Sequence, residues 1–181
     1  MGPPPADRGE DWFTATYAAH YAAIVKYGLR RLGSTDASVE LAQEAFVVAW
    51  RRRAEVPDHS LPWLYGVARR LLANRRRADR NRPVHVPLLG HEEGNDQRAA
   101  EGAAAELAAV RAAMAGLSER DQEILRLIGW EELTVSEAAT VLDCTRTTAA
   151  VRLHRARRRL TAAVAHSTTA TSIPRPAAIP S

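Results

Sequence analysis

The sequence predicts an all-α protein with two small helical domains joined by a flexible linker. Apolar residues recur at three- and four-residue steps in two long stretches, which is the period of an amphipathic helix. No stretch alternates apolar and polar residues over a useful length, so no β-sheet is expected. The segment between the two helical stretches is rich in Pro, Gly and acids and lacks the three- to four-residue apolar period. We therefore expect domains at residues 10–82 and 106–165, a linker at 83–105, and disordered tails at 1–9 and 166–181.

Three helices are expected in the first domain. The first has an apolar face made of Phe13, Tyr17, Tyr21, Ile24, Val25 and Leu32. Residues 33–36 form a turn with an N-cap, and the second helix then carries Val39, Ala42, Phe46, Val47 and Trp50 on one face. The third helix opens at Ser60 with Pro62 in its first turn, where proline is tolerated. Its predicted buried residues are Trp63, Leu64, Val67, Ala68 and Leu71.

Four helices are expected in the second domain. The first carries Leu107, Val110, Met114 and Leu117. Ser118 can cap the next helix, whose predicted buried residues are Ile124, Leu125 and Ile128. Thr134 and Glu137 match a capping box that starts a short third helix. After a three-residue turn at 143–145, a last helix is expected from about Arg146 to Ala162.

The charge of the chain is segregated along the sequence, although its sum is only +4. Residues 51–82 hold 10 Arg and 3 acids, and residues 146–159 hold 6 Arg and no acid. Residues 92–137, between these basic blocks, hold 4 Arg and 11 acids. Lys26 is the single lysine among 25 basic residues, and arginine is the better residue for bidentate contacts with phosphate and guanine. Two separate basic blocks indicate two contacts with a polyanion such as nucleic acid.

Several classes of protein and site are excluded by the sequence. Cys144 is the single cysteine, so neither an intrachain disulfide nor a Cys-based zinc site is expected. The six histidines are scattered without ligand spacing, and none of the common nucleotide-binding, zinc-protease or serine-hydrolase motifs occurs. No apolar run is long enough to span a bilayer, and the N-terminus lacks a secretory signal. We expect a soluble cytoplasmic protein with no catalytic residues, no metal and no cofactor.

Residues 134–157 follow the plan of a helix-turn-helix, with a capped short helix, a tight turn and a basic second helix. In this motif the second helix enters the major groove and presents its N-terminal residues to the base edges. Small residues are needed where the two helices cross, and Ala138, Ala139 and Ala149 meet that need. The candidate donors on the exposed stripe are Arg146, Thr147, Arg152, His154 and Arg155. The alternative is an ordinary αα-hairpin whose arginines are merely solvated.

Two segments of the chain resemble the domains of a known protein family. Residues 117–160, LSERDQEILRLIGWEELTVSEAATVLDCTRTTAAVRLHRARRRL, resemble the promoter −35-reading domain of extracytoplasmic-function sigma factors of bacterial RNA polymerase. Residues 39–77 contain VELAQEAFVVAWRRR and LPWLYGVARRLLANRRR, which are similar to the family domain that binds core polymerase and reads the −10 element. The resemblance covers about residues 11–163. It implies a sigma factor that binds core polymerase and directs promoter recognition and DNA melting.

The resemblance implies three sets of site residues. The set for binding core polymerase is Glu40, Leu41, Gln43, Glu44, Val47 and Arg51. The set for the melted −10 strand, together with the loop 54–60, is Arg69, Arg70, Asn74, Arg75, Arg76 and Arg77. The set for −35 DNA is Arg146, Thr147, Thr148, Ala150, Val151, Arg152, His154 and Arg155. Arg155 is the first candidate for a DNA contact, whereas Arg152 could instead brace its helix. Phe46, Trp50 and Trp63 are expected to lie mostly in the core.

The chain departs from the family pattern at three positions. Val39 stands where the family usually has a second acidic residue. Arg70 stands at a −10 position that is often Asn, and Ala150 replaces a basic residue of the last helix. These departures leave family membership standing and leave the promoter sequence open. The family also implies an anti-sigma factor as a partner, in addition to core RNA polymerase and promoter DNA.

Two other functional classes remain open from sequence. The chain could be a stand-alone helix-turn-helix repressor or activator whose N-terminal domain senses a signal or dimerises. It could also be an interaction protein, or even an enzyme, although the absence of catalytic motifs disfavours the latter. Residues 39–77 separate the sigma factor from the regulator, because a regulator does not need them.

Overall fold

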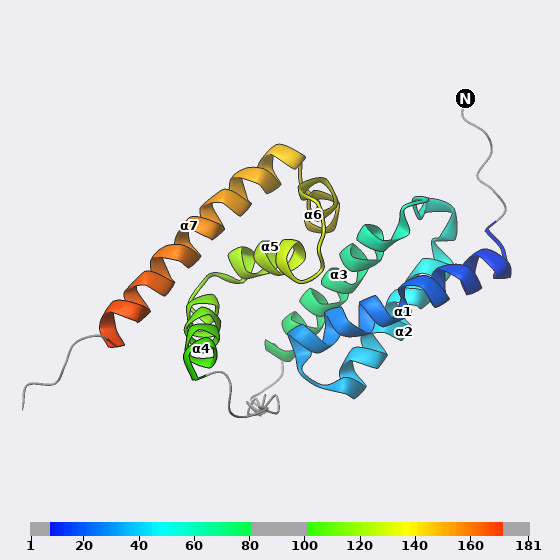
Figure 1. Ribbon diagram of the computed structural model, residues 1–181. Helices are drawn as coiled ribbons and strands as arrows, with labels where there is room; N and C mark the ends of the chain where they lie inside the picture. Colours follow the sequence, from blue (N-terminus) through cyan, green and yellow to red (C-terminus); the bar gives the residue numbers. More distant parts are fainter. Residues whose placement is uncertain (1–7, 81–100, 172–181) are drawn as a thin grey trace, which may run out of the picture. The chain divides into compact units, whose positions relative to one another are not determined.

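The computed structural model describes residues 8–80 and 101–171, and every regular element within them is a helix (Figure 1). The predicted all-α class is therefore confirmed. Backbone contacts group the chain into two compact units, one comprising Met1–Glu93 with Ser136–Thr145 and the other Gly94–Val135 with Arg146–Ser181. Most of the predicted linker, up to residue 100, lies outside the described residues.

The first unit contains α1 (Glu10–Leu32), α2 (Thr35–Arg51) and α3 (Ser60–Arg80), with a short 3-10 turn at Arg53–Glu55. Gly33 ends α1 at φ 66°, a left-handed conformation that glycine adopts without strain, and its N–H donates to the Leu29 carbonyl at 2.9 Å. Ser34 then caps α2, because its side chain accepts a hydrogen bond from the Ala37 N–H at 3.3 Å. The tight α1–α2 turn predicted from residues 33–36 is thus confirmed.

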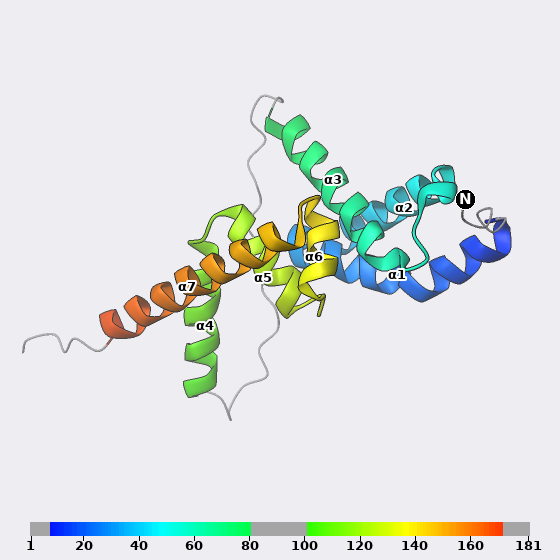
Figure 2. The ribbon, with the colours of Figure 1, turned by 90° about the horizontal axis from the view of Figure 1, so that it is seen from above.

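α1, α2 and α3 pack against one another (Figure 2), and their apolar side chains form a shared core. Ile24, Leu41 and Leu64, one from each helix, are fully buried. α1 and α2 approach so closely that a Cβ added at Gly28 would lie 3.1 Å from the Ser38 Cα. A larger residue at Gly28 would therefore push the two helices apart.

Aromatic side chains fill one end of this core. The Phe46 ring, 1% exposed, lies 4.8 Å from the Tyr17 ring centroid and 6.2 Å from that of Phe13. Offset and edge-on ring contacts of this kind stabilise beyond their buried area. Trp50 is half-buried and meets the Phe13 ring edge-on at 5.3 Å. The prediction that Phe46 belongs mostly to the core is confirmed, and the same prediction for Trp50 agrees in part, because its side chain is half-buried.

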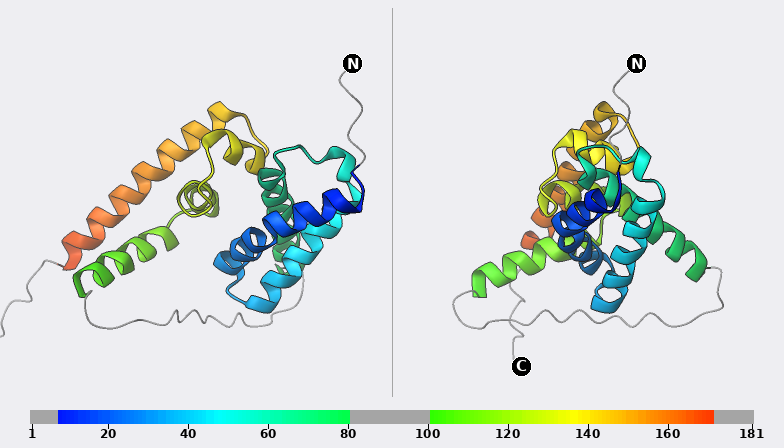
Figure 3. Two further views of the ribbon diagram at one scale, coloured as in Figure 1. Left: turned by 45° about the vertical axis from the view of Figure 1, so that its right-hand side comes forward. Right: turned by 90° about the vertical axis from the view of Figure 1, so that its right-hand side faces the viewer.

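The second unit contains α4 (Glu101–Ala115), α5 (Glu119–Gly129) and α7 (Arg146–Thr171), with α4 and α5 both packed on α7 (Figure 3). Ser118 caps α5 as predicted, accepting a hydrogen bond from the Asp121 N–H at 3.2 Å. Ile124 and Leu127 of α5 are fully buried, and Ala149 and Ala156 of α7 are buried as well. Small residues on α7 allow another helix to approach it closely.

The helix-turn-helix consists of α6 (Val135–Leu142), a turn and α7. α6 begins directly after Thr134, which therefore occupies the predicted N-cap position. In the turn, Asp143 has φ 52°, a left-handed conformation that aspartate tolerates better than most residues. The Cys144 N–H donates to the Ala139 carbonyl at 3.0 Å, which closes the end of α6. The predicted turn at 143–145 is confirmed.

The structure corrects the predicted ends of two helices and some buried positions. α4 begins at Glu101, inside the predicted linker, and α7 continues to Thr171 rather than to about Ala162. The α4 extension, residues 101–105, is rich in alanine, the residue with the highest helix propensity, whereas the α7 extension, residues 163–171, holds more Ser and Thr than Ala. Neither extension shows the apolar periodicity of an amphipathic helix. In α5 the buried leucine is Leu127, while Leu125 and Ile128 are partly exposed. In α3, likewise, Leu72 is buried and Leu71 is only partly buried.

Candidate polymerase and nucleic-acid interface

The predicted polymerase-binding residues divide between the surface and the core of the first unit. Gln43, Glu40 and Arg51 are exposed on α2, and Val47 is an apolar side chain that is 48% exposed. Leu41, in contrast, is 0% exposed and belongs to the core. The sequence could not separate Leu41 from its neighbours, because a family motif covers both faces of a helix. The exposed face of α2 combines an apolar side chain with polar and charged groups.

Arg75 links the polymerase-binding set to the −10 set. From α3 its guanidinium forms ion pairs with Glu44 at 2.8 Å and with Glu40 at 3.2 Å on α2. The Arg75 side chain is only 27% exposed, so solvent screens this charge less than that of the exposed arginines. Glu40 and Glu44, both predicted to bind polymerase, are therefore paired with Arg75, which is predicted to bind DNA. This arrangement makes the α2 and α3 surfaces continuous at Arg75.

The remaining −10 candidates form a basic stretch along α3. Arg70, Asn74, Arg76 and Arg77 are exposed, and Arg69 is half-buried. Within the described part of the chain, Arg69 and Arg70 make no ion pair or hydrogen bond. Arg77 donates to the Asn74 side-chain oxygen at 3.2 Å, which holds both side chains along the helix. Unpaired guanidinium groups on one helix can follow a nucleic-acid backbone.

The α2–α3 loop, residues 52–59, has a largely exposed surface with one buried anchor. Val56 is 2% exposed and fixes the middle of the loop to the first unit. Arg52 and Glu55 form an ion pair, and the hydrogen bond from Arg52 lowers the pKa of the Glu55 carboxyl while raising that of the guanidinium. Arg53 lies over the Trp50 ring, 4.5 Å from its centroid, and donates to the Trp50 carbonyl at 3.1 Å. The loop therefore has a defined conformation while its polar groups stay accessible.

Trp63 at the start of α3 is half-buried rather than enclosed. The Arg52 guanidinium carbon lies 6.0 Å from the centroid of its ring, at the limit of a cation–π contact. The prediction that Trp63 lies mostly in the core agrees with this position only in part, because the side chain is half-buried. Its neighbours Leu64, Val67 and Ala68 are buried as predicted.

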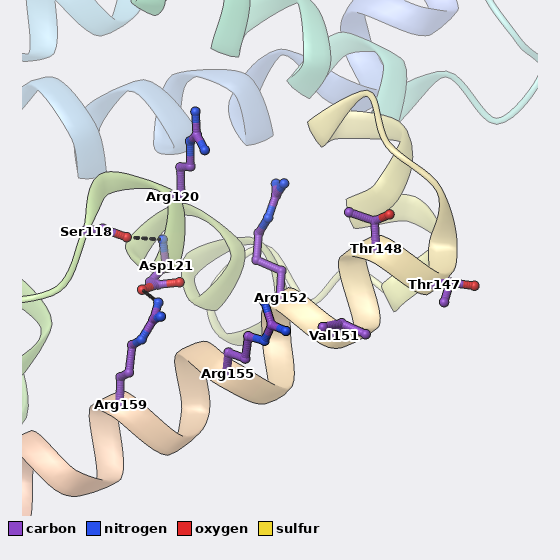
Figure 4. Close-up of a pocket in the computed structure, with 9 residues that line it drawn as sticks. All are labelled: Ser118, Arg120, Asp121, Thr147, Thr148, Val151, Arg152, Arg155 and Arg159. Atoms are coloured by element: carbon purple, nitrogen blue, oxygen red, sulfur yellow. Dashed lines mark hydrogen bonds and ion pairs between the residues drawn. The ribbon is translucent and has the colours of Figure 1, made fainter.

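A groove of about 620 Å³ lies in the second unit beside the N-terminal half of α7 (Figure 4). Thr147, Thr148, Val151, Arg152 and Arg155 line it from α7. Ser118, Arg120 and Asp121 line it from the start of α5. The structure thus brings five of the eight −35 candidates into one groove. The other three, Arg146, Ala150 and His154, are exposed on α7 outside the groove lining.

The arginines of this groove differ in whether they have a partner. Arg159 forms an ion pair with Asp121 at 2.5 Å, and the Asp121 side chain is only 6% exposed (Figure 4). Arg120, Arg152 and Arg155 make no ion pair or hydrogen bond with any residue that the structure describes. Arg159 therefore holds α5 on α7, while the other three present their charge to the groove.

Three charged residues of this groove were not predicted from the sequence: Arg120, Asp121 and Arg159. Asp121 follows the N-cap Ser118 by three residues, so a capping-box pattern with Asp in place of Glu was the available signal. Nothing in the sequence indicates that its carboxylate would face α7, because Arg159 is 38 residues away. Arg120 lies in the acidic stretch 92–137, so the local charge of the sequence does not indicate a nucleic-acid contact there.

The described residues contain neither a metal site nor a membrane span. Within 8–80 and 101–171, no three His, Cys, Asp or Glu side chains gather where they could hold a metal ion. In the same ranges, no helix is both long and apolar enough to cross a bilayer.

Comparisons with known proteins agree with this geometry. Residues 16–82 match the family sigma-70 region 2, and residues 107–160 match sigma-70 region 4. Over 151 residues the chain is 28% identical to the "ECF RNA polymerase sigma factor SigL" of Mycobacterium tuberculosis, covering 81% of this chain and 85% of that protein.

Two solved structures share the fold. One is the sigma factor RpoE in complex with the anti-sigma factor NepR from Bartonella quintana, with a TM-score of 0.63 and 20% identity over 85% of this chain and 97% of that one. The other is CnrH in complex with the cytosolic domain of CnrY, with a TM-score of 0.55 and 22% identity over 85% of this chain and 88% of that one. The two sigma-70 regions occur in their family order and carry the α2–α3 surface and the helix-turn-helix, respectively. The chain therefore belongs to the extracytoplasmic-function sigma factors of bacterial RNA polymerase.

Proposed function

We propose that this sigma factor binds core RNA polymerase through α2 and reads its promoter with two separate basic surfaces, one on α3 and one on α7. The observation that carries the proposal is the presence of unpaired arginines on both helices, each within its own sigma-70 region. A protein that reads two promoter elements needs two such surfaces. Residues 92–137, between the two basic blocks, hold 11 acids and 4 Arg, so DNA would repel most of this stretch; Arg120, which lines the groove beside α7, is an exception.

Core polymerase binds the exposed face of α2, through Glu40, Gln43, Glu44, Val47 and Arg51. Val47 supplies apolar contact area, since nearly half of its side chain is exposed. Glu40 and Glu44 present carboxylates whose positions are fixed by Arg75. Leu41 supports this face from the core and does not itself touch the polymerase.

The melted −10 strand binds α3 and the α2–α3 loop. The backbone of the strand follows Arg69, Arg70, Arg76 and Arg77, and a base that leaves the stack is received by the loop. Arg75 contributes less to the strand than its neighbours, because its charge is shared with two carboxylates. Binding the single strand in preference to the duplex provides the free energy for promoter melting.

The −35 duplex binds the N-terminal half of α7 and the groove beside it. Arg155 and Arg152 are free to form bidentate contacts with guanine or phosphate. Thr147, Thr148 and Arg146 lie in the first turn of α7, where the helix N-terminus favours an anionic phosphate. His154 and Ala150 flank this surface. Arg120 reaches the same groove from α5 and adds a contact with the DNA backbone.

Three further properties complete the proposed function. The protein catalyses no reaction of its own, since its part in transcription is to position the polymerase and open the DNA. It acts in the cytoplasm, where core polymerase and promoter DNA are found. An anti-sigma factor holds it inactive by covering one of these surfaces, as the structural relatives in complex with NepR and CnrY suggest.

Reconstitution with purified core polymerase tests the proposal. Core polymerase plus this chain should produce a run-off transcript from the chain's own promoter, and core polymerase alone should produce none. A helix-turn-helix repressor or activator would instead bind duplex DNA tightly without polymerase and would not associate with it. Failure of the chain to bind core polymerase would reject the proposed function.

A further inference from the structure

Arg8 contacts the α2–α3 loop from a part of the chain that the sequence assigned to a disordered tail. Its side chain is only 12% exposed, although it lies just before α1. One guanidinium nitrogen, Nη1, donates to the Arg53 carbonyl at 2.9 Å and also to the Val56 carbonyl. The other, Nη2, donates to the Asp58 carboxylate at 2.8 Å. The guanidinium carbon lies 5.3 Å from the centroid of the Trp12 ring, which holds the side chain on its other side.

These contacts bring Arg53, Val56 and Asp58 of the loop onto one side chain. Arg53 begins the 3-10 turn and Asp58 lies near the start of α3, so a single guanidinium spans most of the loop. The fixed fork of an arginine suits several acceptors at once, whereas a lysine ammonium would act as a point charge. Because the Asp58 side chain is fully exposed, the interaction with it is weak by itself, and the two carbonyls give the contact its direction.

Apolar packing anchors the loop at one point only, so polar contacts such as those of Arg8 add to its fixation. Val56 is buried, but Arg52, Arg53, Glu55, Pro57, Asp58 and His59 are exposed. Fixing a surface loop before binding lowers the entropy cost of capturing a ligand. We propose that Arg8 is a positioning residue for strand capture, which holds the α2–α3 loop in the conformation that receives an unpaired base. The proposal rests on the proposed −10 function of this loop.

Holoenzyme reconstituted with the full chain tests this role. The probes are single-stranded oligonucleotides that cover the −10 segment of the mapped promoter, either intact or with one abasic site at successive positions. Wild-type holoenzyme should bind at least one abasic probe more weakly than the intact probe, which locates the captured base. Arg8→Ala should weaken binding of the intact probe by about three- to tenfold, the effect of losing a hydrogen-bonded guanidinium. It should also reduce the ratio between intact and abasic probes at that position.

The ratio of binding between intact and abasic probes distinguishes the two roles, because a purely structural role of Arg8 would not change it. If Arg8 only attached the start of the chain to the first unit, its loss would lower thermal stability and leave base capture unchanged in the folded protein. Lys26→Ala is the matched control, because it removes one exposed positive charge from α1 outside the proposed interfaces. Lys26→Ala should behave as wild type in both measurements. Affinity for core polymerase and for a −35 duplex should be unchanged in Arg8→Ala.

Two gentler variants keep the proposal testable if Arg8→Ala does not fold. Arg8→Lys keeps the charge and loses the fork, and Asp58→Asn removes only the exposed carboxylate; both should reduce the ratio, by less than Arg8→Ala does. A wild-type ratio in Arg8→Ala, or in Arg8→Lys if the former is unfolded, would overturn the role of Arg8 alone. If wild-type holoenzyme bound every abasic probe as tightly as the intact probe, the proposed −10 function of the loop would be rejected, and the role of Arg8 would be rejected with it.

Discussion

Arg155 and Arg159 lie about one turn apart on α7, yet the structure gives them different roles. Arg155 has no partner among the described residues, whereas Arg159 is paired with the buried carboxylate of Asp121. We predict that Arg155→Ala weakens −35 binding and leaves stability unchanged. Arg159→Ala should instead lower stability and leave −35 binding unchanged. The pair is a matched comparison, because both substitutions remove one guanidinium from the same basic helix.

The expected magnitudes follow from burial and pairing. Losing a bidentate contact with a base costs about 1–3 kcal/mol of binding free energy, so Arg155→Ala should weaken −35 binding roughly 5- to 150-fold. Removing one partner of a buried ion pair costs about 3–5 kcal/mol of stability. Arg159 is 59% exposed, so solvent screens the pair, and we expect about 1–2 kcal/mol for Arg159→Ala. Arg155→Ala should change stability by less than about 0.5 kcal/mol.

Two measurements separate the variants. Holoenzyme binding to promoter fragments that differ only at −35 reports recognition, and its dependence on salt reports contacts with phosphate. If Arg155 contacts phosphate instead of a base, the slope of log K against log salt should fall by about 0.9. Amide hydrogen exchange of peptides from α5 reports the stability of the α5–α7 contact without requiring two-state unfolding of a two-domain chain. Equal losses of DNA affinity in both variants, or equal destabilisation of α5, would refute the reasoning.

Three other predictions address the −35 contact, the pH response and the core. Val151, 45% exposed in the groove, should contact a thymine methyl; replacing that thymine by deoxyuridine should weaken wild-type binding by about 0.8 kcal/mol and leave Val151→Ala unaffected, as measured by anisotropy. Burial lowers the pKa of His20, so the unfolded state binds its proton more readily. Stability should therefore decrease as the pH falls below about 6.5. Urea titrations at pH 7.5 and 5.5 measure this loss of unfolding free energy, and His20→Gln should make it smaller. An equal loss in wild type and His20→Gln would contradict the prediction. Phe46→Ala should cost about 3–5 kcal/mol of stability in denaturant unfolding, because the ring is 1% exposed among other aromatic rings, and a loss below about 1 kcal/mol would show that the site collapses.

Much of the fold could be predicted because its signals are local. The apolar period of α1, α2 and α3 and the cap residues Ser34 and Ser118 depend on residues within one or two helical turns. The extensions of α4 and α7 escaped prediction for the same reason. The alanine-rich α4 extension has high helix propensity but no apolar stripe, and the Ser/Thr-rich α7 extension also lacks such a stripe, so apolar periodicity indicates neither.

The sequence by itself determined the helical class, the helix-turn-helix and the division of charge into two basic blocks. Only the tertiary structure decided which of these charges are available. Arg75 is bound by Glu40 and Glu44, Arg159 by Asp121, and Arg8 by the loop 52–59, while Arg155 remains unpaired. Each of these partners is more than 30 residues away along the chain. The physical reason is that periodicity shows which face of a helix is buried, whereas an ion pair depends on which distant helix or loop packs against that face.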